Sequence, residues 1–353
     1  MAFDPEKLAR LRRDYADAAG GDIKHPEFAR VAAKIFKSPD QRKWPFAEPA
    51  TFLDAPYRAL ASEADLAGLD AALVGVPMDL GVTNRAGARL GPRAVRGVER
   101  IGPYEHVLGR APLSELRVAD IGDVPMRSRF SLADCHADIE AHFTKLVAAG
   151  IVPLAVGGDH SITWPILRAL GRDRPVGMGH FDAHCDTSGA YEGSKFHHGA
   201  PFRMAVLDGV LDPERTIQIG IRGGAEYLWE FSYDSGMTVI HAEDVDRMGV
   251  AGVVAMARDG VGDGPFYVTF DVDGLDPSFA PGTGTPESGG LSMREALAML
   301  RGLAGLDIVG ADVVEVAPQY DPSTVTAQNA AQVLFTELCL VSIARERRGS
   351  YQR

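Results

Sequence analysis

Carboxylate and imidazole side chains gather at three places in the sequence, each directly after a short apolar run. The members of the three groups are His160; Asp182, His184 and Asp186; and Asp271 and Asp273. Proteins use both kinds of side chain as ligands for divalent metal ions. Four carboxylates brought together without a cation would repel one another and raise one another's pKa values, whereas two divalent ions balance four negative charges. The residue types therefore predict a site for two divalent metal ions.

The spacing of these residues predicts that their side chains converge. Side chains alternate between the two faces of extended backbone, so Asp182, His184 and Asp186 should share one face and Cys185 the other. Two consecutive glycines shortly before His160 permit a sharp turn that leaves its imidazole at the end of the apolar run. As an alternative, aspartates in such places often cap helices or turns, which would explain one of them singly but not the histidines beside them.

Eight short apolar runs alternate with longer stretches of helical pattern. The apolar runs cover residues 70–77, 117–123, 152–159, 175–182, 216–222, 237–244, 266–273 and 307–316. The helical patterns include residues 131–149, 161–171, 244–259 and 292–304. This alternation predicts an α/β fold with a parallel sheet and helices on both faces, in which ligands bind at the carboxyl ends of the strands. All three groups of candidate ligands stand at such ends.

Two further segments are distinguished by their composition. Residues 1–67 carry two charged helical patterns, 5–19 and 26–36, and then a segment rich in proline and aromatic residues. We interpret residues 1–67 as a helical arm that packs on the main domain, residues 68–353, or on a neighbouring subunit. The glycine- and arginine-rich stretch 80–96 is predicted to be a surface loop, lying either over the site or in solvent as a plain connection.

The composition limits the classes of partner and the location. The 353 residues include 36 Lys and Arg against 48 Asp and Glu, a net charge of −12, which disfavours binding to nucleic acid. No apolar run approaches the roughly 20 residues that span a bilayer, and the first residues lack the apolar region of a secretory signal. Three cysteines, an odd number in a large chain, indicate a reducing compartment. We therefore predict a cytoplasmic protein without nucleic acid or membrane partners.

Three motifs, GGDHS, FDAHCD and TFDVDGLDPSFAPGTGTPESGG, occur in this order at the ends of predicted strands. Together they closely resemble the ureohydrolase family, which comprises arginase, agmatinase and the guanidino-acid hydrolases, over roughly residues 68–345. The resemblance implies a three-layer arginase-type fold with an eight-stranded parallel sheet flanked by helices, assembled as a homotrimer or homohexamer. It also implies an agmatinase-like hydrolase that uses two metal ions to convert a small cationic guanidino compound into urea and an amine.

The same resemblance implies how the ligands are divided between the two ions. One ion would be held by His160, Asp182, Asp186 and Asp271. The other would be held by Asp182, His184, Asp271 and Asp273, so that Asp182 and Asp271 bridge the pair. Mn²⁺ is the usual metal of the family and suits carboxylate ligands, while Ni²⁺ is the alternative because the same donors bind it more tightly by intrinsic affinity.

Two more residues complete the match to the family. His198 falls where the family has a proton-shuttling histidine, with His197 as the competing candidate, and Glu315 falls where it has a carboxylate that binds the guanidinium. A histidine titrates near neutrality and can supply a proton to the departing amine, and a carboxylate orients a planar cation. The implied mechanism is metal-assisted hydrolysis in which Asp186 holds the attacking hydroxide and the proton passes through Asp186 and His198. His180 is interpreted as a core residue or a neighbour of the ligands.

The sequence leaves the substrate open. Residues 187–196 do not match the polar pattern with which arginases hold an α-amino acid, which disfavours arginine. This stretch holds one acid, Glu192, and one base, Lys195, so its charge selects neither agmatine nor guanidinobutyrate. The cysteine within FDAHCD and the long arm also resemble the branch that acts with nickel on free guanidine or on biguanides such as metformin. Residues 227–233 (YLWEFSY) either form an apolar wall for the substrate or belong to a helix core.

Two other classes of protein remain as alternatives. The first is a non-catalytic subunit that stabilises an active paralogous partner in a hetero-oligomer, although the chain carries the histidines and carboxylates of an active site. The second is an amide deacetylase of a related fold, which would need one Zn²⁺ and no second set of ligands. Release of urea by the purified chain tests the first, and the number of ions per chain tests the second.

Overall fold

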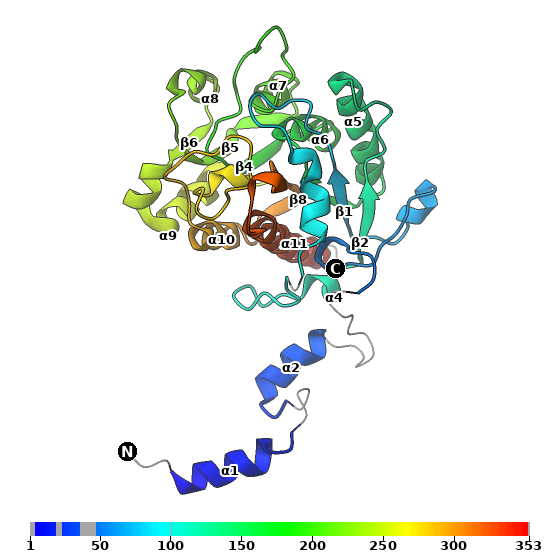
Figure 1. Cartoon of the computed structure of the whole chain (residues 1–353), viewed down its shortest axis with the longest axis vertical. Coiled ribbons are helices and arrows are strands. Elements are labelled where there is room, and N and C mark those ends of the chain that lie inside the picture. Colours follow the sequence, from blue (N-terminus) through cyan, green and yellow to red (C-terminus); the bar gives the residue numbers. More distant parts are fainter. Residues whose placement is uncertain (1–3, 19–22, 36–46, 100, 352–353) are drawn as a thin grey trace. The chain divides into compact units, whose positions relative to one another are not determined.

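The computed structural model describes residues 4–18, 23–35, 47–99 and 101–351. The chain divides into two compact units, Met1–Ala47 and Glu48–Arg353 (Figure 1). No helix in the described part of the chain combines the length and the apolar character needed to cross a membrane.

The first unit contains two helices, α1 (Pro5–Tyr15) and α2 (Pro26–Ile35), and neither has a buried residue. The carboxylate of Asp4 caps α1 by accepting a hydrogen bond from the backbone N–H of Glu6 over 2.9 Å. Residues 1–3, 19–22 and 36–46 of the predicted arm lie outside the described residues. The division of the chain at residue 67 stays a prediction.

The second unit is built on one eight-stranded sheet in which every neighbouring pair is parallel, as the resemblance implied. Its strands are β1 (Ala71–Val76), β2 (Val118–Asp123), β3 (Val152–Gly157), β4 (Val176–Phe181), β5 (Leu211–Ile221), β6 (Thr238–His241), β7 (Pro265–Asp271) and β8 (Asp307–Val314). Their order across the sheet is β2-β1-β3-β8-β7-β4-β5-β6. The strands that precede the candidate ligands, β3, β4 and β7, therefore lie near the middle of the sheet, with β8 between β3 and β7.

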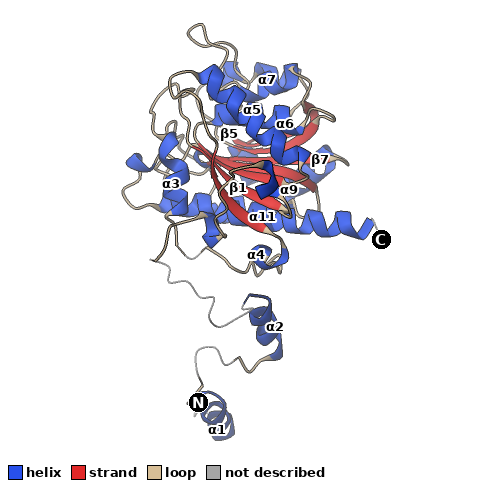
Figure 2. Cartoon of the chain, turned by 90° about the vertical axis from the view of Figure 1, so that its right-hand side faces the viewer, coloured by secondary structure: helices blue, strands red, loops and turns tan. Residues whose placement is uncertain are grey.

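Helices cover both faces of the sheet and complete three layers (Figure 2). They are α3 (Gly91–Arg96), α4 (Pro112–Glu115), α5 (Leu132–Ala148), α6 (Thr163–Leu170), α7 (Pro201–Leu207), α8 (Glu230–Asp234), α9 (Ala242–Val261), α10 (Met293–Gly302) and α11 (Val325–Tyr351). The helices α5, α6 and α7 lie on one face, and α3, α9, α10 and α11 lie on the other.

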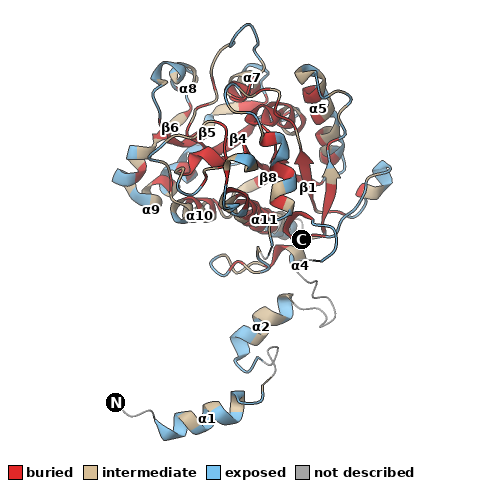
Figure 3. Cartoon of the chain, in the orientation of Figure 1, coloured by how far each residue is buried: buried red, intermediate tan, exposed pale blue. Residues whose placement is uncertain are grey.

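The core consists of two apolar layers, one on each side of the sheet. Alternate residues of β1 belong to different layers: Leu73 packs with the α11 side, and Ala72 and Val74 pack with the α5 side. All six residues of β1 are buried, because a parallel sheet covered on both faces needs apolar side chains in both directions (Figure 3). This explains why the strands appeared in the sequence as continuous apolar runs.

The predicted strands are confirmed to within a few residues, and the larger differences concern β5, the stretch 80–96 and α11. β5 begins at Leu211, five residues before the predicted run. The stretch 80–96 is only partly a loop: its last six residues form α3, which has Pro92 in its first turn and buries Val95 against the core. The helix α11 was not predicted, because its middle part is buried on nearly every side and so lacks the one-sided apolar pattern of a surface helix.

Candidate metal centre

Tight backbone packing places His160 at the carboxyl end of β3. A Cβ atom at Gly158 would lie 1.7 Å from the carbonyl oxygen of Met78, so only glycine fits this position. The chain then turns into a single 3₁₀ turn, His160–Ile162, whose first residue is fully buried. The glycines of the first motif thus direct the His160 imidazole toward the ends of the neighbouring strands.

The first cluster of ligands surrounds the imidazole of His160. Its Nδ1 lies 3.1 Å from Asp182 Oδ2, 3.0 Å from Asp186 Oδ2 and 3.3 Å from Asp271 Oδ2. Nδ1 is buried and makes no hydrogen bond of good geometry with any described residue. Asp186 holds the left-handed conformation, with φ of 52°, which is rare for residues other than glycine and is often found at functional sites.

The second cluster surrounds His184 and shares one residue with the first. His184 Nδ1 lies 3.3 Å from Asp182 Oδ1 and 3.3 Å from Asp273 Oδ2. The two oxygens of Asp182 therefore face different clusters, which is the arrangement expected of a bridging carboxylate. Asp271 presents one oxygen to the His160 cluster, and its other oxygen accepts the backbone N–H of Asp273 over 2.8 Å. The structure thus brings all six predicted ligands together, while their role as ligands stays a proposal.

The electrostatics of the two clusters favour a cation. Burial, and then the charges of Asp273 and Asp182, raise the pKa of Asp271 well above its ordinary value. Burial also raises the pKa of Asp273 to about 6, even though His184 opposes this rise. Negative charge is therefore confined in a space that water does not stabilise, and oxygen and imidazole donors of this kind suit divalent ions. The donor set of this structure fits the metal ions that the motifs imply.

His180 lies beside the clusters and supports Asp182. Its Nε2 lies 2.7 Å from Asp182 Oδ2, and its Nδ1 accepts a hydrogen bond from Gln218 Nε2 over 3.1 Å. Because Gln218 donates to Nδ1, Nε2 carries the proton and donates it to Asp182. His180 is fully buried and lies on β4, one position before the strand ends. Its geometry agrees with the interpretation as a neighbour of the ligands.

His198 and Glu315 lie in direct contact. His198 Nδ1 is 2.9 Å from Glu315 Oε1, and its Nε2 is 2.6 Å from the hydroxyl of Thr83. Burial disfavours the charged imidazole, but the carboxylate of Glu315 outweighs this effect and raises the pKa of His198 to about 9. His197 also lines the cavity, but its Nε2 lies 2.8 Å from the carbonyl oxygen of Gly189. The contact with Glu315 favours His198 over its neighbour as the proton donor.

Glu315 has one carboxylate oxygen in use and one without a partner. Oε1 accepts hydrogen bonds from the backbone N–H of His160, over 2.8 Å, and from His198. Oε2 is buried and has no hydrogen-bond partner among the described residues. The residue also adopts a φ of 65°, so its backbone is held in a conformation rare for glutamate. A buried carboxylate oxygen without a partner requires a donor, and a guanidinium supplies several.

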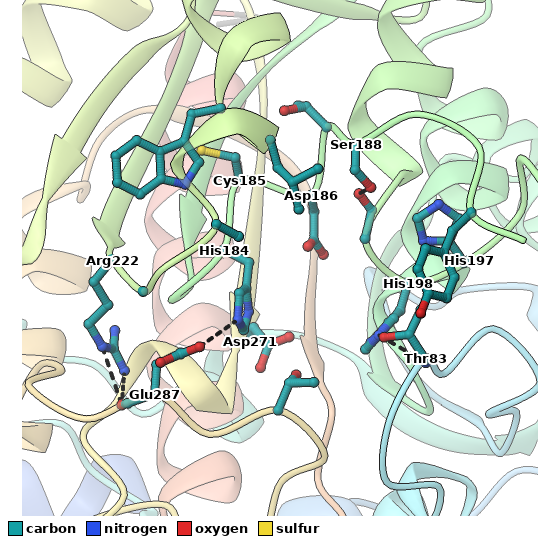
Figure 4. Close-up of a pocket in the computed structure, with 18 of the residues that line it drawn as sticks. Thr83, His184, Cys185, Asp186, Ser188, His197, His198, Arg222, Asp271 and Glu287 are labelled. Carbon is teal, nitrogen blue, oxygen red and sulfur yellow. Dashed lines mark hydrogen bonds and ion pairs between the residues drawn. The ribbon is translucent and has the colours of Figure 1, made fainter.

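A cavity of about 260 Å³ opens beside both clusters (Figure 4). Figure 4 shows His184, Asp186 and Asp271 on one side of it and His198 with Thr83 on the other. The cavity wall includes Leu228 and Trp229, so the segment 227–233 supplies apolar surface to the cavity rather than only to a helix core.

The charged residues in and near the cavity wall differ in whether they can interact with a ligand. Arg222 lines the cavity, but its guanidinium donates hydrogen bonds to the carbonyl oxygens of Gly220, Asp273 and Glu287, so it fixes the backbone. The loop residues Glu192 and Lys195 are not among the residues of the wall.

Four residues that organise the site were missed by the sequence reasoning: Thr83, Asp159, Thr269 and Asp312. Asp159 accepts the backbone N–H of Gly81 over 2.8 Å and so anchors the loop that carries Thr83 to His198. The signal for Thr269 was present, because it stands two positions before Asp271 on the same strand and therefore on the same face. Thr83 gave no such signal, since it lies in an irregular loop.

The match to known proteins defines the class of this chain. Residues 69–339 match the model of the arginase family, and the chain belongs to this family. The eight-stranded parallel sheet and the recognition made from the three motifs are thereby confirmed.

Individual relatives narrow the class to enzymes acting on guanidino compounds. The chain is 49% identical over 301 residues to a guanidinopropionase from Pseudomonas aeruginosa, a match covering 84% of this chain and 94% of the relative. It is 48% identical over 278 residues to a mitochondrial agmatinase from Gallus gallus, covering 78% and 82%. The structure of proclavaminate amidino hydrolase from Streptomyces clavuligerus superposes with a TM-score of 0.81 at 35% identity, covering 86% of this chain and all (100%) of that one. The protein is a ureohydrolase of the agmatinase-like type.

Proposed function

We propose that this ureohydrolase releases urea from a small guanidino compound of the agmatine or guanidinobutyrate kind, at a centre of two divalent metal ions. The observation that carries this proposal is the pair of clusters joined by Asp182, together with the buried oxygen of Glu315 that lacks a partner. Mn²⁺ is the proposed metal, held by His160, Asp182, Asp186 and Asp271 on one side and by Asp182, His184, Asp271 and Asp273 on the other.

Each residue has a role that follows from its contacts. When bound, the metal ions would lower the pKa of a water and so provide the nucleophile. Glu315 Oε2 would accept hydrogen bonds from the guanidinium and hold its plane. Asp186 would accept a proton from the attacking water. Glu315 raises the pKa of His198 to about 9, so His198 would carry the proton that is delivered to the leaving amine.

A second candidate is the nickel-dependent hydrolysis of free guanidine or of a biguanide such as metformin. The apolar surface of Leu228 and Trp229 favours it, because a small or alkylated guanidine needs no charged partner for its remainder. The side chain of Glu287, by contrast, is 40% exposed at the rim of the cavity and favours a substrate with a second cationic group.

A urea-release screen tests the proposal. The purified chain is loaded with Mn²⁺ or with Ni²⁺ and supplied with agmatine, guanidinobutyrate, guanidinopropionate, guanidine or metformin, while bound metal is counted per chain. Urea from one of these compounds with two ions bound supports the proposal. Two bound ions without urea from any compound indicate a non-catalytic subunit, and a single ion indicates the one-zinc deacetylase.

A matched pair of variants assigns the proton donor in the same assay. His198→Asn is expected to reduce urea release strongly, whereas His197→Asn, next in the chain but bonded to a loop carbonyl, is expected to retain it. Equal losses in both variants would contradict the assignment of His198.

Assembly and location complete the proposal. We propose a homotrimer or homohexamer located in the cytoplasm, with a hetero-oligomer as the alternative. Light scattering of the purified chain measures the number of subunits, and cell fractionation measures the location.

A further inference from the structure

A chain of buried polar groups leads from His160 into the interior of the sheet, on the side away from the carboxylates. His160 Nε2 lies 2.8 Å from Thr269 Oγ1, which lies 2.5 Å from Asp312 Oδ1. The other oxygen of Asp312 accepts hydrogen bonds from the hydroxyls of Tyr267 and Thr163, both over 2.7 Å. None of the five side chains is exposed to solvent. Asp312 therefore accepts three hydroxyl donors, and no cationic side chain among the described residues donates to it.

The register of the sheet brings these groups together. Tyr267, Thr269 and Asp271 occupy alternate positions of β7, so their side chains share one face. Thr269 pairs with Asp312 where β7 and β8 run side by side. β7 thus carries both the candidate ligand Asp271 and the Thr269 hydroxyl that contacts Nε2 of His160. The position of this hydroxyl depends on strand pairing rather than on a loop.

The direction of each hydrogen bond follows from the number of protons. The Thr269 hydroxyl has one proton, and its contact with the carboxylate of Asp312 is short and charge-assisted, so the proton lies toward Asp312. Burial raises the pKa of Tyr267 well above its ordinary value, so this phenol also keeps its proton and donates it to Asp312. Thr269 Oγ1 is then left as an acceptor, and Nε2 of His160 must be the donor.

We propose that Asp312, acting through Thr269, is a positioning residue that fixes the tautomer of His160, so that Nε2 carries the proton and Nδ1 offers its lone pair to a divalent metal ion. We call Asp312 and Thr269 the β7–β8 relay. This inference rests on the proposed metal centre. It adds to that proposal a buried contact that positions a ligand of the His160 ion and has no counterpart described at His184.

The surroundings of Nδ1 show what the relay accomplishes. Nδ1 faces carboxylate oxygens of Asp182, Asp186 and Asp271 at 3.0 to 3.3 Å, so a divalent cation placed between them would have donors on several sides. The relay keeps the imidazole from turning Nδ1 away from these oxygens. His184 has a different environment: its Nε2 is 3.9 Å from the partly exposed Glu287. The relay therefore acts on the His160 ion alone.

Titration of the metal-free chain with Mn²⁺ by calorimetry tests the relay. Thr269→Val removes the hydroxyl at nearly constant volume, and Asp312→Asn removes the charge that fixes the direction of the hydroxyl. Each is expected to weaken one of the two Mn²⁺ affinities by about 10- to 100-fold and to leave the other within about threefold. Thr269→Ser restores the hydroxyl and is expected to retain both affinities.

Two further variants separate the relay from a general effect on the fold. Tyr267→Phe removes one donor to Asp312 but leaves the link to Thr269, and Thr336→Val removes another fully buried threonine hydroxyl, on α11, which donates to the carbonyl oxygen of Gln332. Both are expected to bind Mn²⁺ as the unaltered chain does. If Thr269→Val does not fold, the comparison of Asp312→Asn with Tyr267→Phe gives the same test.

The outcomes distinguish failure of the relay from failure of the metal centre. Unaltered affinities in Thr269→Val and Asp312→Asn, equal weakening of both ions, or a loss in Thr269→Ser as large as in Thr269→Val would each overturn the relay. An unaltered chain that binds fewer than two Mn²⁺ ions overturns the proposed centre itself, and the relay with it.

Discussion

Replacing Glu315 by glutamine tests the central contact between protein and substrate. Both neighbours of Oε1 are donors, the backbone N–H of His160 at 2.8 Å and His198 at 2.9 Å, so the amide oxygen would remain at the Oε1 position. The amide NH₂ would then take the place of Oε2 and point hydrogen-bond donors at a guanidinium that has only donors itself. The variant keeps the shape of the residue and reverses the polarity of the atom that binds the substrate.

The magnitude follows from the bonds that are lost. A hydrogen bond to a charged partner contributes about 1.5–3 kcal/mol, and losing the equivalent of about 3 kcal/mol lowers kcat/KM about 150-fold. The pH dependence changes as well. Glu315 is the main group that raises the pKa of His198 to about 9, so without it the loss of the protonated donor, and of the rate, begins at a lower pH.

The assay is urea release at varied pH by the metal-loaded variant, with bound metal and melting temperature measured alongside. Glu192→Gln is the control, because this exposed loop glutamate does not line the cavity; we expect a loss of less than about fivefold. A Glu315→Gln enzyme that binds two ions and retains kcat/KM within about threefold of the unaltered chain would refute the assigned role of Glu315.

Three further predictions concern the ligands, the cysteine and stability. Asp271→Asn should lower bound Mn²⁺ below two ions per chain, measured by elemental analysis, and abolish urea release; full turnover with two ions bound would contradict its role. Cys185→Ser should retain the metal content, since burial raises the pKa of this thiol to about 12 and so disfavours a thiolate ligand. The hydrogen bond from Arg117 lowers the pKa of Asp70 from 3.8 to about 2, so its contribution to stability is present above pH 4 and lost toward pH 2. The midpoint of unfolding by added urea should therefore differ less between the unaltered chain and Asp70→Asn as pH falls from 5 to 3. A constant difference would contradict this.

The sequence permitted accurate prediction of what depends on local pattern. The strands of a sheet covered on both faces are continuous apolar runs, so all eight were found, and the candidate ligands were found because they stand at strand ends. The predicted run of β5 was too short because residues 212–215, which follow the buried Leu211, are at least partly exposed and lack that pattern. The helix α11 was missed for the opposite reason, since its middle is buried nearly all round.

Partners joined across long sequence separations could not be predicted in the same way. Thr83 reaches His198 from a position 115 residues away, and Asp312 reaches Thr163 across 149 residues. Nothing in the local sequence of Thr83 indicates this contact, because it depends on how Asp159 anchors the loop. Only the three-dimensional arrangement shows which hydroxyl contacts which imidazole.

The order of the strands has a consequence for how the protein is made. β8 lies between β3 and β7, so the half of the sheet that carries His160 cannot join the half that carries Asp182 and Asp271 until β8 has left the ribosome. A growing chain that ends before residue 307 therefore holds the two halves of the centre apart. A product truncated before β8 would still carry Asp182, His184, Asp271 and Asp273, the proposed ligands of one ion, but would lack the strand that joins His160 to them.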